Sequence, residues 1–493
     1  MAILGLQLVL SLIVFSFLNK VSPYFSFARW LLRGRLVRYL HPSDEDLKSA
    51  AGIPTTNGKV KMKRSEARKQ EAKASSNSFT IPRNTHLNLD TAKVEILDLM
   101  QLKFYADYQW LLDFTLSAIV VYVLTEIYYG LGPKTEINIS VLWCLLAIGF
   151  GIRILIAQTA MYFRTQDGGE RILCFTFGFF FLVASMGILV IDDKILEFGL
   201  EDGYNNFSQS AENYLKKQGI TSQGPITFLT FKIILIVICC ISGALLTFPG
   251  LRYARLHLDS LKYNKESPHK QVLLHLNFIL PLIVILLWVK PIGRNIICGK
   301  AWKVQALIPE ESFDIVRLVL IAAMFVMRLC LMVTHMQAHL NLAFEKVESM
   351  RKESGRVTNL EIQQMITSVF YYLCVVALQY ITPVIILLFL MFLHKTLGNY
   401  SWIALFGEST EEYFKEFVVS AVGKPLPRTP LPTNLTAEEA ALTANQFAVA
   451  ITNLRSVFSY IWYRGVLSFI TWWVNAAWFT STAFGVYYYS KLT

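Results

Sequence analysis

The chain alternates long apolar runs with short polar stretches, and this pattern predicts helices in a membrane. A spanning helix needs roughly 20 apolar residues, because the hydrocarbon core is about 30 Å thick. Backbone groups in lipid must bond to one another, and a spanning barrel would alternate polar and apolar residues, which these runs do not. We therefore predict an all-α polytopic membrane protein with nine transmembrane helices, at 2–18, 108–130, 139–161, 172–191, 227–248, 272–289, 314–334, 366–393 and 464–489.

The order of these runs predicts five parts, and composition supports the membrane class. Of 493 residues, 54% are hydrophobic and 16% are charged, against about a quarter charged in soluble domains. The parts are a first transmembrane anchor (1–20), a basic cytosolic segment (21–107), a core of seven transmembrane helices (108–393), a lumenal or extracellular loop (394–463), and the last helix with a short cytosolic tail (464–493).

Glycosylation sequons indicate which side of the membrane the loops occupy. Four N-x-[ST] tripeptides follow spans 2, 4 and 8, so nine spans place them all on one side. The glycosylated side is lumenal or extracellular. Asn206 and Asn434 lie in longer loops and are the expected glycan sites; Asn138 and Asn399 lie close to a span end and are less suited.

Basic residues give the same orientation. The opposite short loops hold eleven Lys and Arg in sixty-four residues, whereas the sequon-side loops hold thirteen in about 135. Cytosolic loops carry the excess of positive charge, so the N-terminus is expected outside and the C-terminus in the cytosol. The alternative, a cleaved signal peptide at 2–18, lacks a basic leading region and an A-x-A cleavage site.

The segment 21–107 contains much of the net charge of +11. Residues 24–40 mix aromatic and leucine side chains with arginines, which predicts a basic amphipathic helix on the membrane or, alternatively, a plain positive flank of span 1. Residues 53–85 are expected to be disordered. We expect residues 24–40 and, within the second stretch, 59–73 to bind the anionic cytosolic leaflet rather than nucleic acid. The basic residues expected to do so are Arg29, Arg33, Arg35, Arg38, Lys61, Lys63 and Arg64.

Ionisable residues inside the predicted spans are the main candidates for function. They are costly in lipid and usually face protein or water. They form either an ion or proton path or links between helices, and Lys232 in span 5 is expected to reach toward the interface. Asp113 and Arg328 fall in the same half of the membrane and are expected to pair. The candidate set is Asp113, Glu126, Arg153, Arg317 and Arg328.

The sequence offers little for catalysis or metal binding. Asp-Gly-Gly-Glu-Arg (167–171) is expected to be the cytosolic turn between spans 3 and 4, and a cofactor loop is the alternative. His335-x-x-x-His339 puts two imidazoles on one helical face, but no third ligand lies nearby. Six of the seven cysteines lie in spans, so no disulfide framework is expected. We expect no enzymatic activity, cofactor or metal.

Eight short stretches carry a resemblance to a known family. They are "YQWLLDFT" (108–115), "NISVLWCLL" (138–146), "DGGERILCFTFGFFF" (167–181), "LEFGLEDGYNNFS" (196–208), "LTFPGLR" (246–252), "LLWVKPI" (286–292), "VFYYLCVVALQY" (369–380) and "LSFITWW" (467–473). The resemblance covers most of the chain except 41–90 and 405–450. On these stretches the chain resembles the transmembrane protein 161 family.

The resemblance implies a multi-pass protein without known enzymatic activity. Family members are linked to membrane excitability and heart rhythm through restraint of potassium and calcium currents, to calcium homeostasis and, in one vertebrate branch, to protection from oxidative stress. The implied function is modulation of ion currents in the plasma membrane or endoplasmic reticulum, with ion channels or calcium-handling proteins as partners. The alternatives are a channel or transporter that uses the intramembrane charges, and an integral membrane enzyme.

Overall fold

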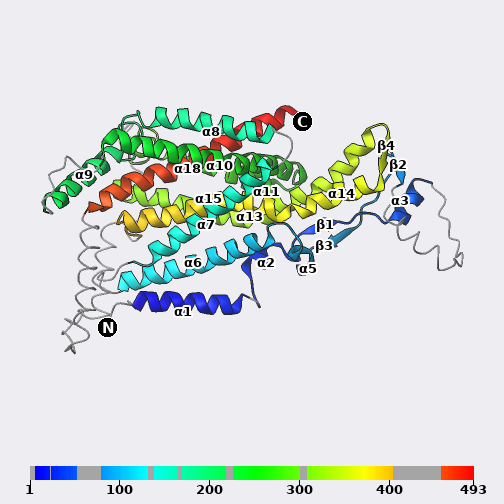
Figure 1. Cartoon of the computed structure of the whole chain (residues 1–493), viewed down its shortest axis with the longest axis horizontal. Helices are drawn as coiled ribbons and strands as arrows, with labels where there is room; N and C mark the ends of the chain where they lie inside the picture. The colour runs from blue at the N-terminus through cyan, green and yellow to red at the C-terminus, as the bar shows by residue number, and fades with distance from the viewer. Residues whose placement is uncertain are drawn as a thin grey trace.

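The computed structural model is a bundle of long helices with a small lobe at one end (Figure 1). It describes residues 6–22, 24–52, 79–131, 138–164, 169–217, 226–299, 308–402 and 457–492. Seven helical segments within these ranges are long and apolar enough to cross a membrane. The chain is therefore a helical polytopic membrane protein, as its apolar runs predict.

Each of the nine predicted spans overlaps one long helix. Most of these helices continue beyond the apolar run, because polar residues that favour helix extend them into the flanking regions. The helices are α1 (Leu6–Val21), α6 (Tyr105–Leu131), α7 (Ser140–Phe163), α8 (Gly169–Ile188), α10 (Phe228–Tyr263), α11 (Pro268–Leu286), α13 (Glu310–Lys352), α15 (Leu373–Leu397) and α18 (Tyr460–Leu492).

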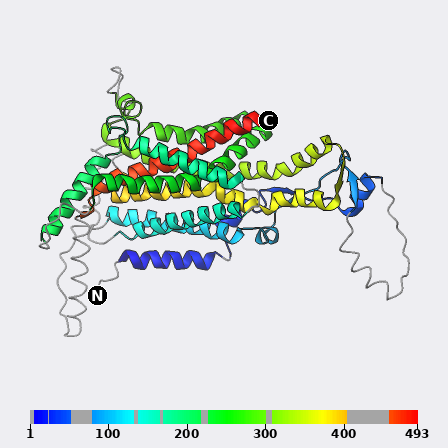
Figure 2. The same ribbon diagram turned by 45° about the horizontal axis from the view of Figure 1, so that its top comes forward.

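The first and last of the nine differ from the other seven. Helix α1 has 16 residues, about 24 Å at 1.5 Å per residue, which is shorter than the hydrocarbon core. Helix α18 has 33 residues and is long enough, but it carries Trp, Tyr, Ser, Thr and Asn along its length and is not among the seven helices apolar enough to span. Both lie along the bundle (Figures 1 and 2). For these two helices the count of nine spans stays a prediction.

Helix α15 occupies the centre of the bundle. Every residue from Leu373 to Lys395 is buried, and α15 packs against α6, α7, α10, α13 and α18. A helix that is hydrophobic all round is buried on all sides, which matches its nearly unbroken apolar sequence. The other bundle helices expose apolar faces, such as Phe175 and Phe179 on α8, which suit contact with lipid.

Glycines bring α10 and α18 into close contact. A Cβ atom on Gly250 would lie 2.5 Å from the Cβ of Ser481, and one on Gly485 would lie 2.6 Å from the Cβ of Ala254. Small residues at helix interfaces let backbones approach closely, which is how membrane helices gain packing energy. The pair therefore depends on glycine at both positions.

The bundle has two distinct ends. One, which we call the α9 end, carries α9 (Leu200–Lys217) and α12 (Arg294–Ile297). The other, the α14 end, carries α14 (Asn359–Tyr371), which is separated from α15 by Tyr372. Figure 1 shows the start of α1 near the α9 end and the end of α18 near the α14 end.

The end lobe is a second, smaller core at the α14 end. Strand β1 (Val37–Tyr39) pairs antiparallel with β3 (Thr91–Lys93), and β2 (Thr80–Pro82) pairs with β4 (Arg356–Thr358). Helices α3 (Asp44–Ala50), α14 and the last turns of α13 complete it, while α2 (Phe27–Leu32) and α5 (Ile96–Met100) lie beside α6. Its apolar centre includes Leu47, Ile81, Val347, Val357 and Ile366.

The lobe adds two small sheets to the predicted helical fold and corrects the predictions for residues 53–85 and 21–107. The fold is mostly but not wholly helical, because four three-residue strands form two small sheets. The expected disorder over 53–85 is wrong for 79–85, where Ile81 is buried and β2 pairs with β4; residues 53–78 lie outside the described ranges. The basic segment 21–107 is partly a folded layer against α13 and α14 rather than a linker. The pairing of β2 with β4 joins residues about 280 positions apart, such as Thr80 and Thr358, so local sequence gave no sign of it.

Candidate functional site

The five predicted intramembrane charges do not form one group. Among the described residues, no ion pair or hydrogen bond joins any two of Asp113, Glu126, Arg153, Arg317 and Arg328. Each has its own neighbours. Some of the charges join two segments of the fold, and others lack a counter-ion among the described residues.

Asp113 links α6 to the segment that precedes it in sequence. Its carboxylate accepts hydrogen bonds from the Ser26 hydroxyl at 2.7 Å and from the backbone N–H of Ala28 at 3.2 Å. Both donors lie at the start of α2, where free backbone N–H groups and the helix dipole favour a negative charge. Asp113 therefore anchors α2 to the bundle.

Glu126 and Arg317 each form ion pairs near the α9 end, but with different partners. Glu126 on α6 forms an ion pair with Lys395 in the last turn of α15. Lys395 falls in the predicted loop 394–463 and was not among the predicted intramembrane charges, although a lysine just after an apolar run is a common helix-end residue. Arg317 binds other partners, so the charges of Glu126 and Arg317 are neutralised separately.

Arg317 belongs to a compact network of two arginines and two carboxylates, which we call the α9-end network. Glu197 lies 2.8 Å from Arg317 and 2.9 Å from Arg294, while Asp314 lies 3.0 Å and 2.7 Å from the same arginines. The Leu287 carbonyl also accepts from Arg317. Burial raises the pKa of Glu197, but Arg317 and Arg294 outweigh it and hold that pKa below its ordinary value. This geometry is typical of a structural ion-pair network, and it joins the segments that carry Glu197, Arg294 and α13.

Arg328 is the exception, because aromatic rings rather than carboxylates surround it. The side chain is fully buried, and its guanidinium carbon lies 3.7 Å from the ring centroid of Tyr253, 4.6 Å from Trp478 and 5.0 Å from Tyr380. Its three guanidinium nitrogens make no hydrogen bond within the described part of the chain. Desolvated cation–π contacts contribute about 2 kcal/mol or more, so the rings stabilise a charge that carries no counter-ion there.

Polar groups from α11 and from α13 itself border this caged arginine. The Asn277 amide on α11 donates to the Tyr253 hydroxyl at 3.2 Å. The Tyr380 hydroxyl donates to the Arg328 carbonyl at 2.9 Å and lies 3.3 Å from Nδ1 of His335. Helices α10, α11, α13, α15 and α18 therefore meet here. The arrangement fixes a positive charge inside the bundle and holds it rigidly.

The predicted pairing of Asp113 with Arg328 is wrong. Asp113 faces α2 on the outside of α6, whereas Arg328 faces the junction of α10, α15 and α18. Similar depth on two antiparallel helices was the basis of that pairing, but depth gives neither the side of each helix nor the neighbour it meets.

His335 also has a structural setting, since its Nδ1 lies 2.9 Å from the Leu331 carbonyl.

The remaining two intramembrane cations lie toward the outside of the bundle. Lys232 donates to the Leu189 carbonyl at 2.9 Å and lies over the Phe228 ring, so it reaches a helix end as expected. Arg153 is exposed on α7, and no ion pair, hydrogen bond or ring contact is found for it among the described residues. It is the one candidate charge that the fold leaves unexplained.

The predicted amphipathic helix over 24–40 is wrong as a whole. Only Phe27–Leu32 is helical, and β1 follows after a turn. Arg29 donates to the Ser22 carbonyl and Arg38 pairs with Asp98, so these two stabilise the fold. Arg33 and Arg35 are exposed, and Arg35 lies over the exposed Trp30 ring at 3.7 Å. Lys61, Lys63 and Arg64 lie outside the described residues.

The sequons lie in different local structures. Asn138 accepts hydrogen bonds from Ser140 at the start of α7, and Asn206 is half-buried on α9, where it accepts from the Ser459 hydroxyl. Asn399 is exposed in a left-handed backbone conformation with φ 54°. Asn434 lies outside the described ranges, so glycosylation remains a prediction at all four.

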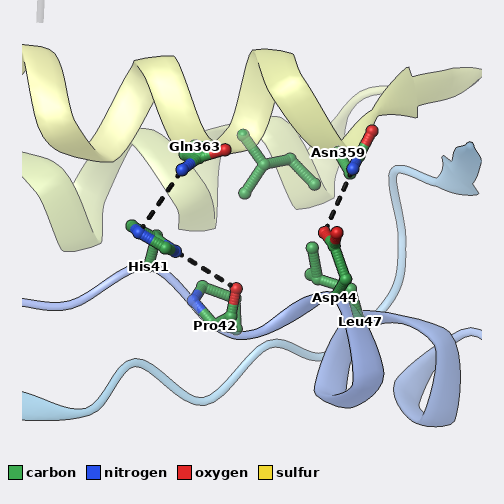
Figure 3. Close-up of a pocket in the computed structure, with 7 residues that line it drawn as sticks. His41, Pro42, Asp44, Leu47, Asn359 and Gln363 are labelled. Atoms are coloured by element: carbon green, nitrogen blue, oxygen red, sulfur yellow. Dashed lines mark hydrogen bonds between the residues drawn. The ribbon is translucent and has the colours of Figure 1, made fainter. Parts of the chain in front are cut away.

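A polar pocket of about 160 Å³ lies in the end lobe (Figure 3). Asn359 at the start of α14 donates to Asp44 at 3.1 Å, and the Gln363 amide lies 3.4 Å from Nε2 of His41. Figure 3 shows these side chains bridging the pocket in pairs. They join α14 to the chain after β1, which is a structural role. No group of three metal-binding side chains occurs among the described residues.

Comparison with known proteins agrees with this architecture. No solved structure matches the chain significantly. The family model described as predicted transmembrane protein 161AB matches residues 2–493, which is nearly the whole chain. The apolar helices, the buried central helix and this match lead to one assignment: the chain belongs to the transmembrane protein 161 family.

Proposed function

We propose that this protein is a non-enzymatic membrane protein that modulates potassium or calcium currents, or calcium homeostasis, and so sets membrane excitability. The family resemblance implies this role. The observation that carries it is the filled centre of the bundle, since α15 is buried from Leu373 to Lys395. A protein with that centre is better suited to act on other proteins than to conduct ions.

The intramembrane charges support the same proposal. Asp113, Glu126 and Arg317 serve local links between segments rather than a continuous path. The caged Arg328 is a fixed positive charge in the core, and a fixed arginine opposes the passage of cations. Both features disfavour cation flow through the bundle.

We further propose nine spans, an outside N-terminus and a cytosolic end lobe, in the plasma membrane or endoplasmic reticulum. The sequons and basic loops support this orientation. The exposed Arg33, Arg35 and Trp30 would then face the anionic leaflet. Retention of anionic lipid by the purified protein should fall with salt and with Arg33→Gln plus Arg35→Gln.

Currents in cells test the proposed role directly. Removing the protein should increase whole-cell potassium or calcium currents, and restoring the wild type should reduce them again. Unchanged currents in excitable cells that normally contain the protein would contradict it. Surface levels of the conducting channels need to be measured in parallel, because altered trafficking and altered gating both count as modulation.

One observation favours a second function, a channel or transporter. The guanidinium of Arg328 has no hydrogen-bond partner among the described residues, which is unusual for a fully buried charge. An ion-conducting protein uses such a group to bind or repel ions. This alternative predicts that the purified protein itself passes ions and that Arg328→Leu changes the flux.

A further inference from the structure

One face of α7 points away from the bundle and is almost entirely apolar. Its exposed positions recur every three or four residues, which places them on one stripe of the helix. The opposite side of α7, with Ile154 and Leu155, is buried, and α7 packs there against α15. The exposed stripe consists of Leu142, Leu145, Leu146, Gly149, Ile152, Arg153 and Ile156.

Arg153 is the single charge on this stripe and lies near the middle of the helix. At 1.5 Å per residue it is about 20 Å from the first residue of α7 and about 15 Å from the last. An extended arginine side chain is shorter than either distance, so it does not reach the headgroups of a straight, unthinned bilayer. A charge at this depth in lipid is costly, and such residues usually face protein or water. A lipid-facing Arg153 therefore needs a partner.

A second copy of the chain does not offer that partner. Among the described residues, the carboxylates inside the nine apolar runs and away from their ends are Asp113 and Glu126, and both are already bonded. Glu345, in the polar continuation of α13, is paired with Lys262. The neighbouring positions on the stripe are leucine, isoleucine and glycine. The complementary group has to come from a different membrane protein.

We propose that this face of α7 binds a transmembrane helix that carries one Asp or Glu near the middle of its span. The carboxylate would pair with Arg153, and the flanking Leu and Ile side chains would pack along the partner. A Cβ on Gly149, one turn away, would meet nothing within 4 Å, so the partner backbone has room to approach. The proposal rests on the proposed function, because a modulator of currents needs a surface that contacts other membrane proteins.

The test uses designed helices in vesicles. The purified full-length protein is reconstituted with a labelled poly-leucine helix that contains one central Glu, or with its Gln counterpart, and association is measured by energy transfer. The wild type should bind the Glu helix at least tenfold more tightly than the Gln helix. Arg153→Leu should remove this preference and Arg153→Lys should keep part of it, whereas Lys232→Leu, which removes a cation elsewhere, should leave it intact.

Equal binding of the Glu and Gln helices by the wild type would overturn the proposal, as would a preference that survives Arg153→Leu. Thermal unfolding in detergent checks folding, and Arg153→Leu should be at least as stable as the wild type because it breaks no described contact. A photo-crosslinker at Leu146 should label the Glu helix, while one at Ile241 on the exposed face of α10 should not. Intact helix binding with unchanged currents in cells would contradict the proposed function alone.

Discussion

The three arginines within the predicted spans have different surroundings, although they are the same residue type. Arg317 is held by two carboxylates and a carbonyl, Arg328 by three aromatic rings, and Arg153 has no described partner. Removing a paired charge leaves its partner buried and costs about 3–5 kcal/mol. The three arginines therefore predict different responses to substitution.

Asp113 and Arg328 should behave independently. Asp113→Leu leaves the Ser26 hydroxyl and the Ala28 N–H without an acceptor, which costs about 1–3 kcal/mol for each group that stays buried. Arg328→Leu loses the ring contacts but also removes a desolvated charge. Because the two sites share no contact, the losses in the double variant should add within about 0.5 kcal/mol. Thermal unfolding in detergent measures these losses. A double variant more stable than either single variant would contradict this prediction and support a direct pairing of Asp113 with Arg328.

The α9-end network should make stability depend on acid pH. The pKa of Glu197 is lower in the folded state than in the unfolded state, so its contribution is fully present above the ordinary glutamate pKa of about 4.3. It disappears as pH falls through the lower, folded-state pKa. Unfolding temperatures between pH 7 and pH 3 should fall less steeply in Glu197→Gln than in the wild type. Glu201→Gln, an exposed acid on α9, serves as the control and should follow the wild type.

At the scale of elements, the close contact of α10 with α18 should tolerate no added atom. Gly250→Ala places a Cβ 2.5 Å from that of Ser481, and overpacking of this kind costs about 1–3 kcal/mol. Gly187→Ala on α8 meets nothing within 4 Å and should stabilise by about 0.5–1 kcal/mol, because alanine favours helix over glycine. Thermal unfolding of the two variants should shift in opposite directions. A neutral Gly250→Ala would mean that the two helices are farther apart.

The apolar runs predicted the positions of the long helices well, but the sequence did not predict contacts between residues far apart in the chain. All nine runs overlap helices because the requirement to bury backbone groups in lipid is local. The partners of the charges are not local: Glu197 lies 120 positions from Arg317, and Tyr253 and Trp478 reach Arg328 from two other helices. Strands β2 and β4 were missed for the same reason. The exposed stripe of α7 could be identified only from the structure, because it depends on which helices pack against α7.

At the scale of the whole molecule, the fold places α9 at one end of the bundle and the folded lobe at the other (Figure 2). The proposed orientation puts the lobe in the cytosol. Endoglycosidase should therefore shift the mobility of the natural chain through Asn206 or Asn434. Lys352→Asn, which completes a sequon with Glu353 and Ser354 at the exposed end of α13, should add no glycan. A glycan at that position would show that the orientation in the membrane is the reverse of the proposed one.

The central claim is that the protein alters currents without conducting ions, and flux through vesicles tests it most directly. Purified protein is reconstituted at several densities beside a known potassium channel as a positive control, and potassium and calcium release are followed with and without a membrane potential. We predict no flux above that of protein-free vesicles for the wild type or for Arg328→Leu, while unfolding temperatures confirm that both are folded. Flux that scales with the amount of wild-type protein and changes in Arg328→Leu would contradict the claim and assign the molecule to the channels or transporters.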